Sequence, residues 1–183
     1  MSGTGQKKKK KERSPLEIAA SLLSARPLSR AELKKKLHDR ELSWTVAEQT
    51  VLDCERLGFI NDPDTAESYV RSMRNRGDGA RKIRMKLRIR GFKKDDVENA
   101  FLRDDESSER KEPDVAYAVL QRKKLTLERE ENLLKRKNKA LRILASRGFP
   151  PDAAFQALDR FFGRNDALIL EEPEGSDFPE DPR

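Results

Sequence analysis

Apolar residues recur along this chain at helical spacing, and one short pattern appears three times. The three copies are LKKKLHDREL at 33–42, IRMKLRIRGF at 83–92 and ALRILASRGF at 140–149. Each copy has a leucine five positions before, and an arginine two positions before, its apolar last residue. Equivalent positions are 50 and then 57 residues apart. A period of this size, carried by helical patterns, predicts tandem helical units.

Residues with capping chemistry precede most of the predicted helices. A serine or threonine followed three positions later by glutamate can satisfy free backbone amides at a helix start. Aspartate before proline or ahead of a glutamate gives a similar signal. Together these signals predict helix starts at Ser14, Ser29, Thr45, Asp62 and Asp95, with further helices over 80–90, from 114 onward and over 153–162. No stretch alternates apolar and polar residues for long, so no strand is predicted.

The pattern therefore predicts an all-α fold of tandem three-helix, helix-turn-helix-like repeats that form an elongated, curved array. The predicted order is a disordered basic tail at 1–13, a first repeat at 14–60, a second repeat at 61–103, a linker at 104–113, a third repeat at 114–163 and a disordered acidic tail at 164–183. Each repeat is too small to bury its own apolar face, so neighbouring repeats are expected to cover one another. Such arrays usually present an extended surface to a partner.

Composition favours thin helical layers over one large core, because 40% of the residues are charged, 35% are hydrophobic and only 6% are aromatic. The formal net charge of +7 is unevenly distributed. Residues 1–13 carry +5 (six Lys/Arg, one Glu), and residues 164–183 carry −5 (two Arg, seven Asp/Glu), which leaves +7 for the body. A basic body of this kind indicates a polyanionic or acidic partner.

Residues for catalysis or metal binding are scarce. His38 is the only histidine, which excludes a multi-histidine metal site, and we expect it on a solvated helix surface. Cys54, the only cysteine, lies in an apolar-patterned helix and is predicted to pack as a small hydrophobic side chain. No apolar run approaches the ~20 residues of a membrane span. We expect a monomeric cytoplasmic protein that is not an enzyme and has no catalytic residue, metal site or cofactor.

The strongest chemical signal is cationic. Residues 71–94 contain eleven Lys/Arg and one Asp, and residues 122–147 contain ten Lys/Arg and three Glu. Like charges four residues apart on a helix cost ~0.2–0.5 kcal/mol per pair when no anion is near. We therefore favour an anion-binding surface, although lysine and arginine also serve simply to solubilise long helices.

A helical wheel divides the residues of the predicted helix at 80–90. Ala80, Ile83 and Leu87 share an arc that must face the core, because successive residues advance by ~100°. One flank carries Arg81, Arg84 and Arg88, and the other carries Lys82, Lys86 and Arg90. Met85 and Ile89 lie on the far side, where either a neighbouring repeat or a partner could cover them.

The run GFINDPDTAESYVRSMRNRGDGARKIRMKLRIRGF, residues 58–92, resembles the central signature of the RecX family of bacterial regulators of the RecA recombinase. That signature has a Gly-aromatic-Ile-Asp-Asp turn, a helix with Ala and Tyr/Phe-Val-x-x-Arg, a glycine-rich turn and a basic Ile-x-x-x-Leu-x-x-x-Gly helix. These places are taken by Gly58, Phe59, Ile60, Asn61, Asp62, Ala66, Tyr69, Val70, Arg74, Gly77, Gly79, Ile83, Leu87 and Gly91, with Arg74 one residue later than the strictest spacing. The chain departs from the signature at Asn61, where aspartate is usual, and at Asp64-Thr65, where an Arg-aromatic pair is common.

The resemblance implies three tandem three-helix repeats, no catalytic activity, and binding along the RecA–DNA filament. It also implies inhibition of filament growth and of the ATPase, strand-exchange and coprotease functions of RecA, and hence a role in DNA repair, recombination and the SOS response. The candidate surface for acidic protein or for the phosphates of single- or double-stranded DNA consists of Arg71, Arg74, Arg81, Lys82, Arg84, Arg88, Lys94, Lys123, Lys124, Lys135, Lys137 and Arg142. A second hypothesis is a DNA-binding transcriptional regulator that uses helix-turn-helix-like units alone.

Overall fold

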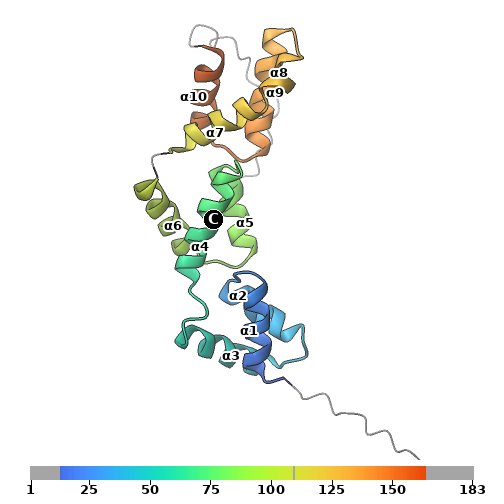
Figure 1. Cartoon of the computed structure of the whole chain (residues 1–183), viewed down its shortest axis with the longest axis vertical. Coiled ribbons are helices and arrows are strands. Elements are labelled where there is room, and N and C mark those ends of the chain that lie inside the picture. Colours follow the sequence, from blue (N-terminus) through green and yellow to red (C-terminus); the bar gives the residue numbers. More distant parts are fainter. Residues whose placement is uncertain (1–12, 109, 164–183) are drawn as a thin grey trace, which may run out of the picture. The chain divides into compact units, whose positions relative to one another are not determined.

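The computed structural model describes residues 13–108 and 110–163, and these residues form helices and turns with no strand (Figure 1). The predicted tails at 1–13 and 164–183 lie outside this range except for Arg13. In chain order the helices are α1 (Pro15–Ala25), α2 (Arg30–His38), α3 (Trp44–Arg56), α4 (Asp62–Asn75), α5 (Ala80–Ile89), α6 (Lys94–Ser107), α7 (Glu112–Arg122), α8 (Lys124–Glu128), α9 (Leu133–Ser146) and α10 (Pro151–Phe162). The prediction of an all-helical fold is confirmed.

The helices belong to two compact units. Among the described residues, unit 1 contains 13–71 and 84–104, and unit 2 contains 72–83 and 105–163. The boundary therefore passes through α4 and α5, and each unit holds one junction between successive repeats.

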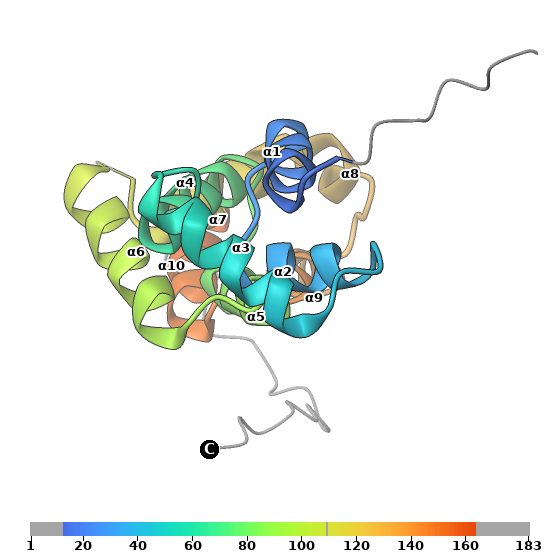
Figure 2. The same ribbon diagram turned by 90° about the horizontal axis from the view of Figure 1, so that it is seen from below.

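In unit 1, α1, α2 and α3 pack against one another around a small core (Figure 2). Its buried side chains are Ala19, Leu28, Leu33, Leu37, Ala47, Val51, Cys54 and Ile60. Cys54 is fully buried, as predicted, and burial raises the pKa of its thiol, with a smaller contribution from the Asp53 carboxylate. The thiol therefore acts as a packed side chain.

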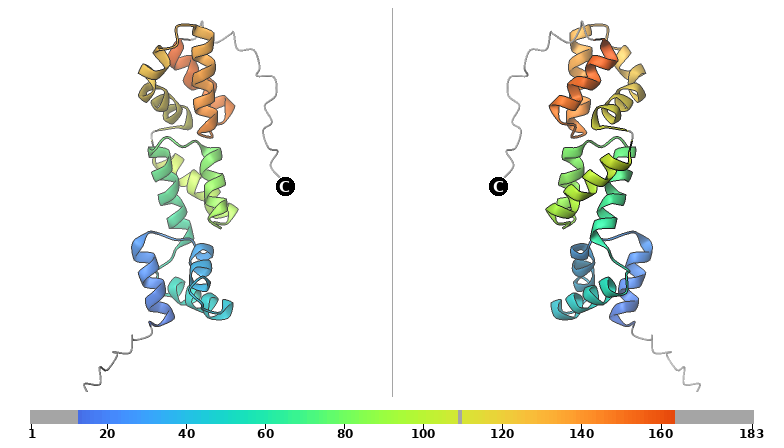
Figure 3. Two further views of the ribbon diagram at one scale, coloured as in Figure 1. Left: turned by 90° about the vertical axis from the view of Figure 1, so that its right-hand side faces the viewer. Right: turned by 90° about the vertical axis from the view of Figure 1, so that its left-hand side faces the viewer.

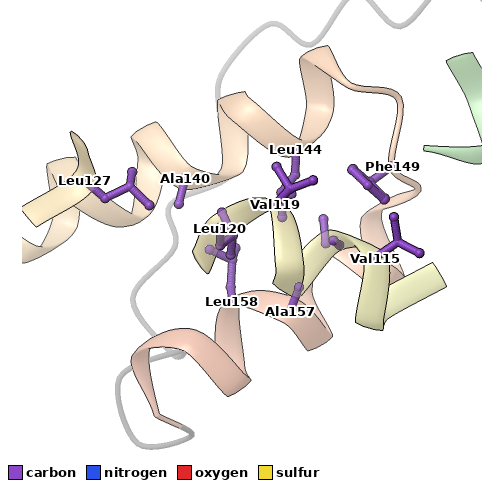
Figure 4. Packing of buried hydrophobic residues seen from close by; sticks show 11 residues of the cluster. Val115, Val119, Leu120, Leu127, Ala140, Leu144, Phe149, Ala157 and Leu158 are labelled. Atoms are coloured by element: carbon purple, nitrogen blue, oxygen red, sulfur yellow. The ribbon is translucent and has the colours of Figure 1, made fainter. Parts of the chain in front are cut away.

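In unit 2, α7 and α10 lie side by side and α9 packs against both (Figure 3). Their core contains Val115, Val119, Leu120, Leu127, Ala140, Leu144, Phe149, Ala157 and Leu158 (Figure 4). Val115 and Phe149 lie at one end of this cluster, and Leu127 of α8 lies at the other end.

Two predicted caps are correct and three need revision. Ser14 and Ser29 each form a capping box with the glutamate three positions later. Thr45 does not cap α3, because the helix begins one residue earlier and the Ser43 hydroxyl accepts the Val46 amide at 3.3 Å. Competition between two hydroxyl residues two positions apart cannot be decided from their local chemistry.

The predicted caps at Asp62 and Asp95 are also wrong. Asp62 is the first residue of α4, and the side chain of the preceding Asn61 accepts the Asp64 amide at 3.2 Å. The Asp62 carboxylate instead accepts the Arg30 amide at 2.9 Å, which joins α4 to the start of α2. Asp95 lies within the first turn of α6, which begins at Lys94.

The predicted linker at 104–113 is shorter in the structure. Helix α6 continues to Ser107, and α7 begins at Glu112. The polar sequence favours a linker, but Asp104 is 3% exposed and forms an ion pair with Arg71 at 3.7 Å. Asp104 therefore lies on the buried face of α6, together with Ala100 and Phe101.

The junction in unit 1 is formed by Arg90 and Gly91, which pack on the start of α2. The Arg90 guanidinium donates to the Glu32 carboxylate at 2.8 and 3.0 Å and to the Pro27 carbonyl at 3.2 Å. The Ser29 hydroxyl donates in return to the Arg90 carbonyl at 2.5 Å. The guanidinium also lies over the Tyr69 ring, 3.8 Å from its centre. This arginine is therefore fixed by several contacts that link the first and second copies of the repeated pattern.

The junction in unit 2 repeats this arrangement with Arg147 and Gly148. The Arg147 carbonyl accepts the Gly79 amide at 2.8 Å, and its guanidinium donates to the Gly77 carbonyl at 3.1 Å. Gly77 and Gly79 are 50 positions after Pro27 and Ser29, and Arg147 is 57 positions after Arg90, so the same repeat positions meet in both junctions. The repeated arginine therefore marks the contact between successive repeats.

Candidate partner-binding surface

The candidate cations of unit 1 are exposed on α4, α5 and the start of α6. Arg71 pairs with Glu67 at 2.8 Å, and Arg84 pairs with Glu98 at 2.8 and 2.9 Å. The hydrogen bond from Arg84 lowers the pKa of the Glu98 carboxyl, so this glutamate stays ionised. Because these pairs lie in contact with water, each contributes little to stability, roughly 0–1 kcal/mol. A partner can therefore compete for these cations at low cost.

Arg88 and Lys94 complete the unit 1 set, and both side chains are exposed. Between the arginines of α5, Met85 is 49% exposed and Ile89 is 76% exposed, whereas Ile83 and Leu87 on the inner face are fully buried. The core-facing stripe is thus predicted correctly. Cover by a neighbouring repeat is one of the two predicted alternatives for Met85 and Ile89. Within unit 1, the neighbouring repeat does not cover them. These two residues form an exposed apolar pair flanked by arginines.

Arg74 and Lys137 are both predicted to bind a partner, and the structure corrects both predictions. Arg74 is 8% exposed and pairs with Asp105 at 2.7 Å and with Glu112 at 3.6 Å, so it holds α4 to α6 and α7 within unit 2. Lys137 is 5% exposed because it lies on the buried face of α9 with Ala140 and Leu144. Both residues are buried, so neither belongs to the exposed cationic surface.

The remaining unit 2 candidates are more accessible. Arg81, Lys123, Lys124, Lys135 and Arg142 are exposed or half-buried, and Lys82 is half-buried beside Asp78 at 3.0 Å. Lys124 pairs with Glu128 of its own helix at 3.7 Å. Among the described residues, Lys123, Lys135 and Arg142 form no ion pair. Within unit 2, these three cations need least rearrangement to meet an anion.

Sequence reasoning missed three features of the surface. Trp44 is 52% exposed, and its ring stacks on His38 with centroids 3.9 Å apart. His38 is half-buried rather than fully solvated, and its Nδ1 lies 3.0 Å from the Leu42 carbonyl oxygen. In unit 2, Leu133 and Leu134 are exposed at the first turn of α9. Apolar periodicity could have identified the leucines, since they precede the buried stripe of the same helix.

The described residues contain no cluster of three or more His, Cys, Asp or Glu side chains that could hold a metal ion. Over the same residues, no helix is long and apolar enough to cross a membrane. What the geometry offers is a set of exposed cations and apolar side chains on helices. The fold therefore defines a protein of tandem three-helix domains.

Comparison with known proteins identifies the family. The family model described as "RecX, second three-helix domain" matches residues 61–100, and "RecX, third three-helix domain" matches residues 111–158. A "Regulatory protein RecX" from Stenotrophomonas maltophilia is 30% identical over 154 residues, which cover 84% of this chain and 91% of the relative. The "Regulatory protein RecX" from Shewanella oneidensis is 36% identical over 115 residues, which cover 58% of this chain and 91% of the relative. The chain belongs to the RecX family.

Other relatives differ in length and in sequence. The chain spans only 57% of the "Regulatory protein RecX" from Leuconostoc mesenteroides, to which it is 27% identical over 155 residues. The crystal structure of RecX from Lactobacillus salivarius superposes with a TM-score of 0.69 at 21% identity, covering 80% of this chain and 93% of that one. A second crystal structure, of regulatory protein RecX, superposes with a TM-score of 0.65 at 19% identity. It covers 82% of this chain and 70% of that chain. These structures show the tandem helical fold.

Proposed function

We propose that this protein binds the RecA–DNA filament and restrains filament growth, and with it the ATPase and recombinase activities of RecA. It acts as a cytoplasmic monomer in DNA repair and the SOS response, and it has no catalytic activity of its own. Family membership supports the recombinase as partner. The surface chemistry supports acidic protein and DNA phosphate as the groups that are contacted.

One observation carries the proposal: the outer face of α5 combines exposed arginines with an exposed apolar pair. Arg84 and Arg88 flank Met85 and Ile89, while Ile83 and Leu87 hold the helix on the core. A helix that is only solvated has no need for large apolar side chains on its outer face. An interface uses both kinds of side chain, because apolar anchors exclude water and charged groups fix the orientation.

The accessible cations of unit 2 supply contacts for the phosphate groups of DNA. Lys123, Lys135 and Arg142 are suited to contact a nucleic-acid backbone, since such contacts need accessible charge but no base-reading geometry. Arg74 and Lys137 are left out of the proposed interface because both are buried. A regulator that reads duplex DNA alone would need side chains that reach base edges, and no observation on the described residues favours that hypothesis.

The test is the rate of ATP hydrolysis by RecA assembled on single-stranded DNA. Replacing Arg81, Arg84 and Arg88 together by alanine removes three exposed charges from one flank of α5. At roughly 0.5–1 kcal/mol for each exposed charge contact, the inhibiting concentration should rise by at least about tenfold. The helical signal in circular dichroism should not change, because none of the three side chains is buried.

The matched control replaces Lys35, Arg40 and Arg56, three exposed cations of the first repeat, by alanine. It makes the same change in net charge, so it separates a local interface from general electrostatic attraction. Equal loss of inhibition in the two triple variants would refute an α5 interface. A protected duplex sequence without any effect on RecA turnover would favour the transcriptional regulator.

A second variant tests the apolar part of the interface at constant charge. Met85→Ser with Ile89→Ser should weaken inhibition, whereas Leu52→Ser, at a residue 42% exposed on α3, should leave it unchanged. Inhibition that survives the α5 double change would show that the arginines act without apolar anchoring.

A further inference from the structure

Two aromatic rings stack at the surface of the first repeat. The Trp44 indole lies on the His38 imidazole with ring centres 3.9 Å apart and an angle of 23° between the planes. The imidazole is held in turn by its Nδ1, which lies 3.0 Å from the Leu42 carbonyl oxygen. Trp44 remains 52% exposed although the imidazole covers one face of its ring. The other face of the indole is therefore open to solvent, on a ring that is already held in a fixed plane.

These rings occupy positions that carry cations in the second repeat. Helices α2 and α5 are in the same register, because the buried Leu33 and Leu37 lie 50 positions before the buried Ile83 and Leu87. Trp44 begins α3, as its counterpart begins α6. The corresponding positions are Lys34 and Arg84, His38 and Arg88, and Trp44 and Lys94. The face that presents three cations on the second repeat thus presents one cation and two rings on the first.

Positive charge accompanies the ring pair. The Lys34 ammonium lies 5.7 Å from the centre of the Trp44 ring. It pairs with the Glu48 carboxylate at 2.6 Å, and Arg30 holds the same carboxylate at 2.8 Å, so two cations share this acid. Residues 34–41 contain four Lys/Arg and two Asp/Glu. An open ring face beside cations suits single-stranded nucleic acid, because every base has a planar face and is joined to a phosphate.

We propose that Trp44 is a stacking site for a base of single-stranded DNA. The base lies on the open face of the indole and extends the stack that His38 begins, and the adjoining phosphate meets Lys34. Duplex DNA does not fit this site, because its bases are already stacked on one another. An acidic peptide can pair with Lys34 but brings no base to the ring.

The site deepens the proposed function, and only this consequence rests on that function. The first repeat and residues 84–104 belong to the same compact unit. Unit 1 therefore combines a face of α5 for the recombinase filament with a ring for single-stranded DNA. A regulator of a filament that assembles on single-stranded DNA gains affinity for the strand itself through such a contact.

Tryptophan fluorescence tests the site directly, because Trp44 is the only tryptophan of the chain. Titration of the full-length protein with oligothymidylate should quench the emission saturably, since the stacked base contacts the indole. An abasic strand of the same length, the corresponding duplex and polyglutamate of the same charge should each leave most of the emission. Without quenching by oligothymidylate the proposal fails. Equal quenching by polyglutamate would also overturn it, in favour of an acidic protein at this site.

Affinity for a labelled oligothymidylate, measured by fluorescence anisotropy, gives the second readout. It is measured at high salt, where phosphate contacts contribute least. Trp44→Ala should weaken binding by about five- to a hundredfold, and Trp44→Phe, which keeps a ring, should weaken it less. The matched control is Phe59→Ala, at an aromatic residue that is 54% exposed outside the stack, and it should leave the affinity unchanged.

Circular dichroism checks that each variant is folded, and quenching of the unaltered protein does not depend on any variant. Equal affinities of Trp44→Ala and Phe59→Ala would overturn the stacking site. The assays contain no RecA, so their outcome is separate from that of the ATPase test of the α5 interface.

Discussion

The junction in unit 1 leaves no space for a side chain at Gly91. Its φ is +78°, and a β-carbon built there would lie 2.4 Å from the β-carbon of Ala31. Ordinary contact between carbon atoms is ~3.5–4.0 Å, so α2 or the Arg90-Gly91 turn would have to move by about an ångström. Gly91→Ala should therefore destabilise the protein through both backbone strain and overlap.

The two contributions can be separated by a control and a rescue. A non-glycine residue in the left-handed region costs ~1–2 kcal/mol, and overlap in a packed region costs ~1–3 kcal/mol, so Gly91→Ala should cost ~2–5 kcal/mol. Gly58 has a φ of +72°, and nothing lies within 4 Å of the position that a β-carbon would take there, so Gly58→Ala should cost only the strain. That strain is ~1–2 kcal/mol.

Ala31→Gly supplies the rescue. Once the Ala31 β-carbon is removed, the next atoms are the Ala31 α-carbon at 3.9 Å and the Ser29 hydroxyl oxygen at 4.0 Å, both at ordinary contact distance. In this background Gly91→Ala should cost no more than Gly58→Ala, which corresponds to a coupling of ~1–3 kcal/mol in a double-mutant cycle.

Urea unfolding measured by circular dichroism and by tryptophan fluorescence provides the free energies. Trp44 is the only tryptophan, so its emission reports on the first repeat, while circular dichroism reports on all helices. Equal costs for Gly91→Ala and Gly58→Ala, or no recovery with Ala31→Gly, would refute close packing at this junction.

Three further predictions follow from burial and charge. Leu87→Ala should cost ~2–5 kcal/mol in urea unfolding because Leu87 is fully buried, whereas Lys86→Ala should stay within ~0.5 kcal/mol, and equal costs would mean that the helical phase is wrong. Burial alone raises the pKa of the Glu32 carboxyl, but hydrogen bonds from Arg90 and Arg26 outweigh burial and lower the pKa. The ionised carboxylate therefore stabilises the folded protein. This contribution is complete above about pH 4.3, the pKa of an unfolded glutamate, and is lost as the pH falls through the lowered pKa. Glu32→Gln should remove this loss from the pH dependence of the unfolding midpoint. Deleting residues 1–13, which carry five consecutive lysines, should flatten the salt dependence of DNA binding while filament regulation persists, and loss of regulation would contradict the assignment of that role to 71–147.

The helical class and the buried stripes could be predicted from the sequence because both follow from local periodicity. Ile83 and Leu87 are buried, and Ser14 and Ser29 cap their helices, since each depends on residues within one or two turns. Arg74 could not be assigned in this way. Its partners Asp105 and Glu112 lie 31 and 38 positions away, and a basic residue inside a basic run gives no sign of a distant carboxylate.

Lys137 is a different kind of error, because the signal is present in the sequence. It lies three positions before Ala140 and seven before Leu144, and this spacing places it on the buried face of α9. A count of positive charges along 122–147 does not show which face of the helix each charged residue occupies. A lysine at a core position of a helix packs its aliphatic stem against the core and is therefore better left out of a cationic surface.

The position after the repeated arginine has two requirements that can be separated. One is the backbone conformation of the turn, and the other is space for the neighbouring repeat at the junction. In the first copy the pair is Arg40-Glu41, and Glu41 keeps a φ of +68° although it is not glycine. The turn alone therefore tolerates a side chain, at the cost of some backbone strain. At Gly91 and Gly148, by contrast, a β-carbon would lie 2.4 Å from Ala31 and 2.5 Å from Lys82. Glycine is required where the start of a preceding helix packs on the turn, as at Gly91 and Gly148.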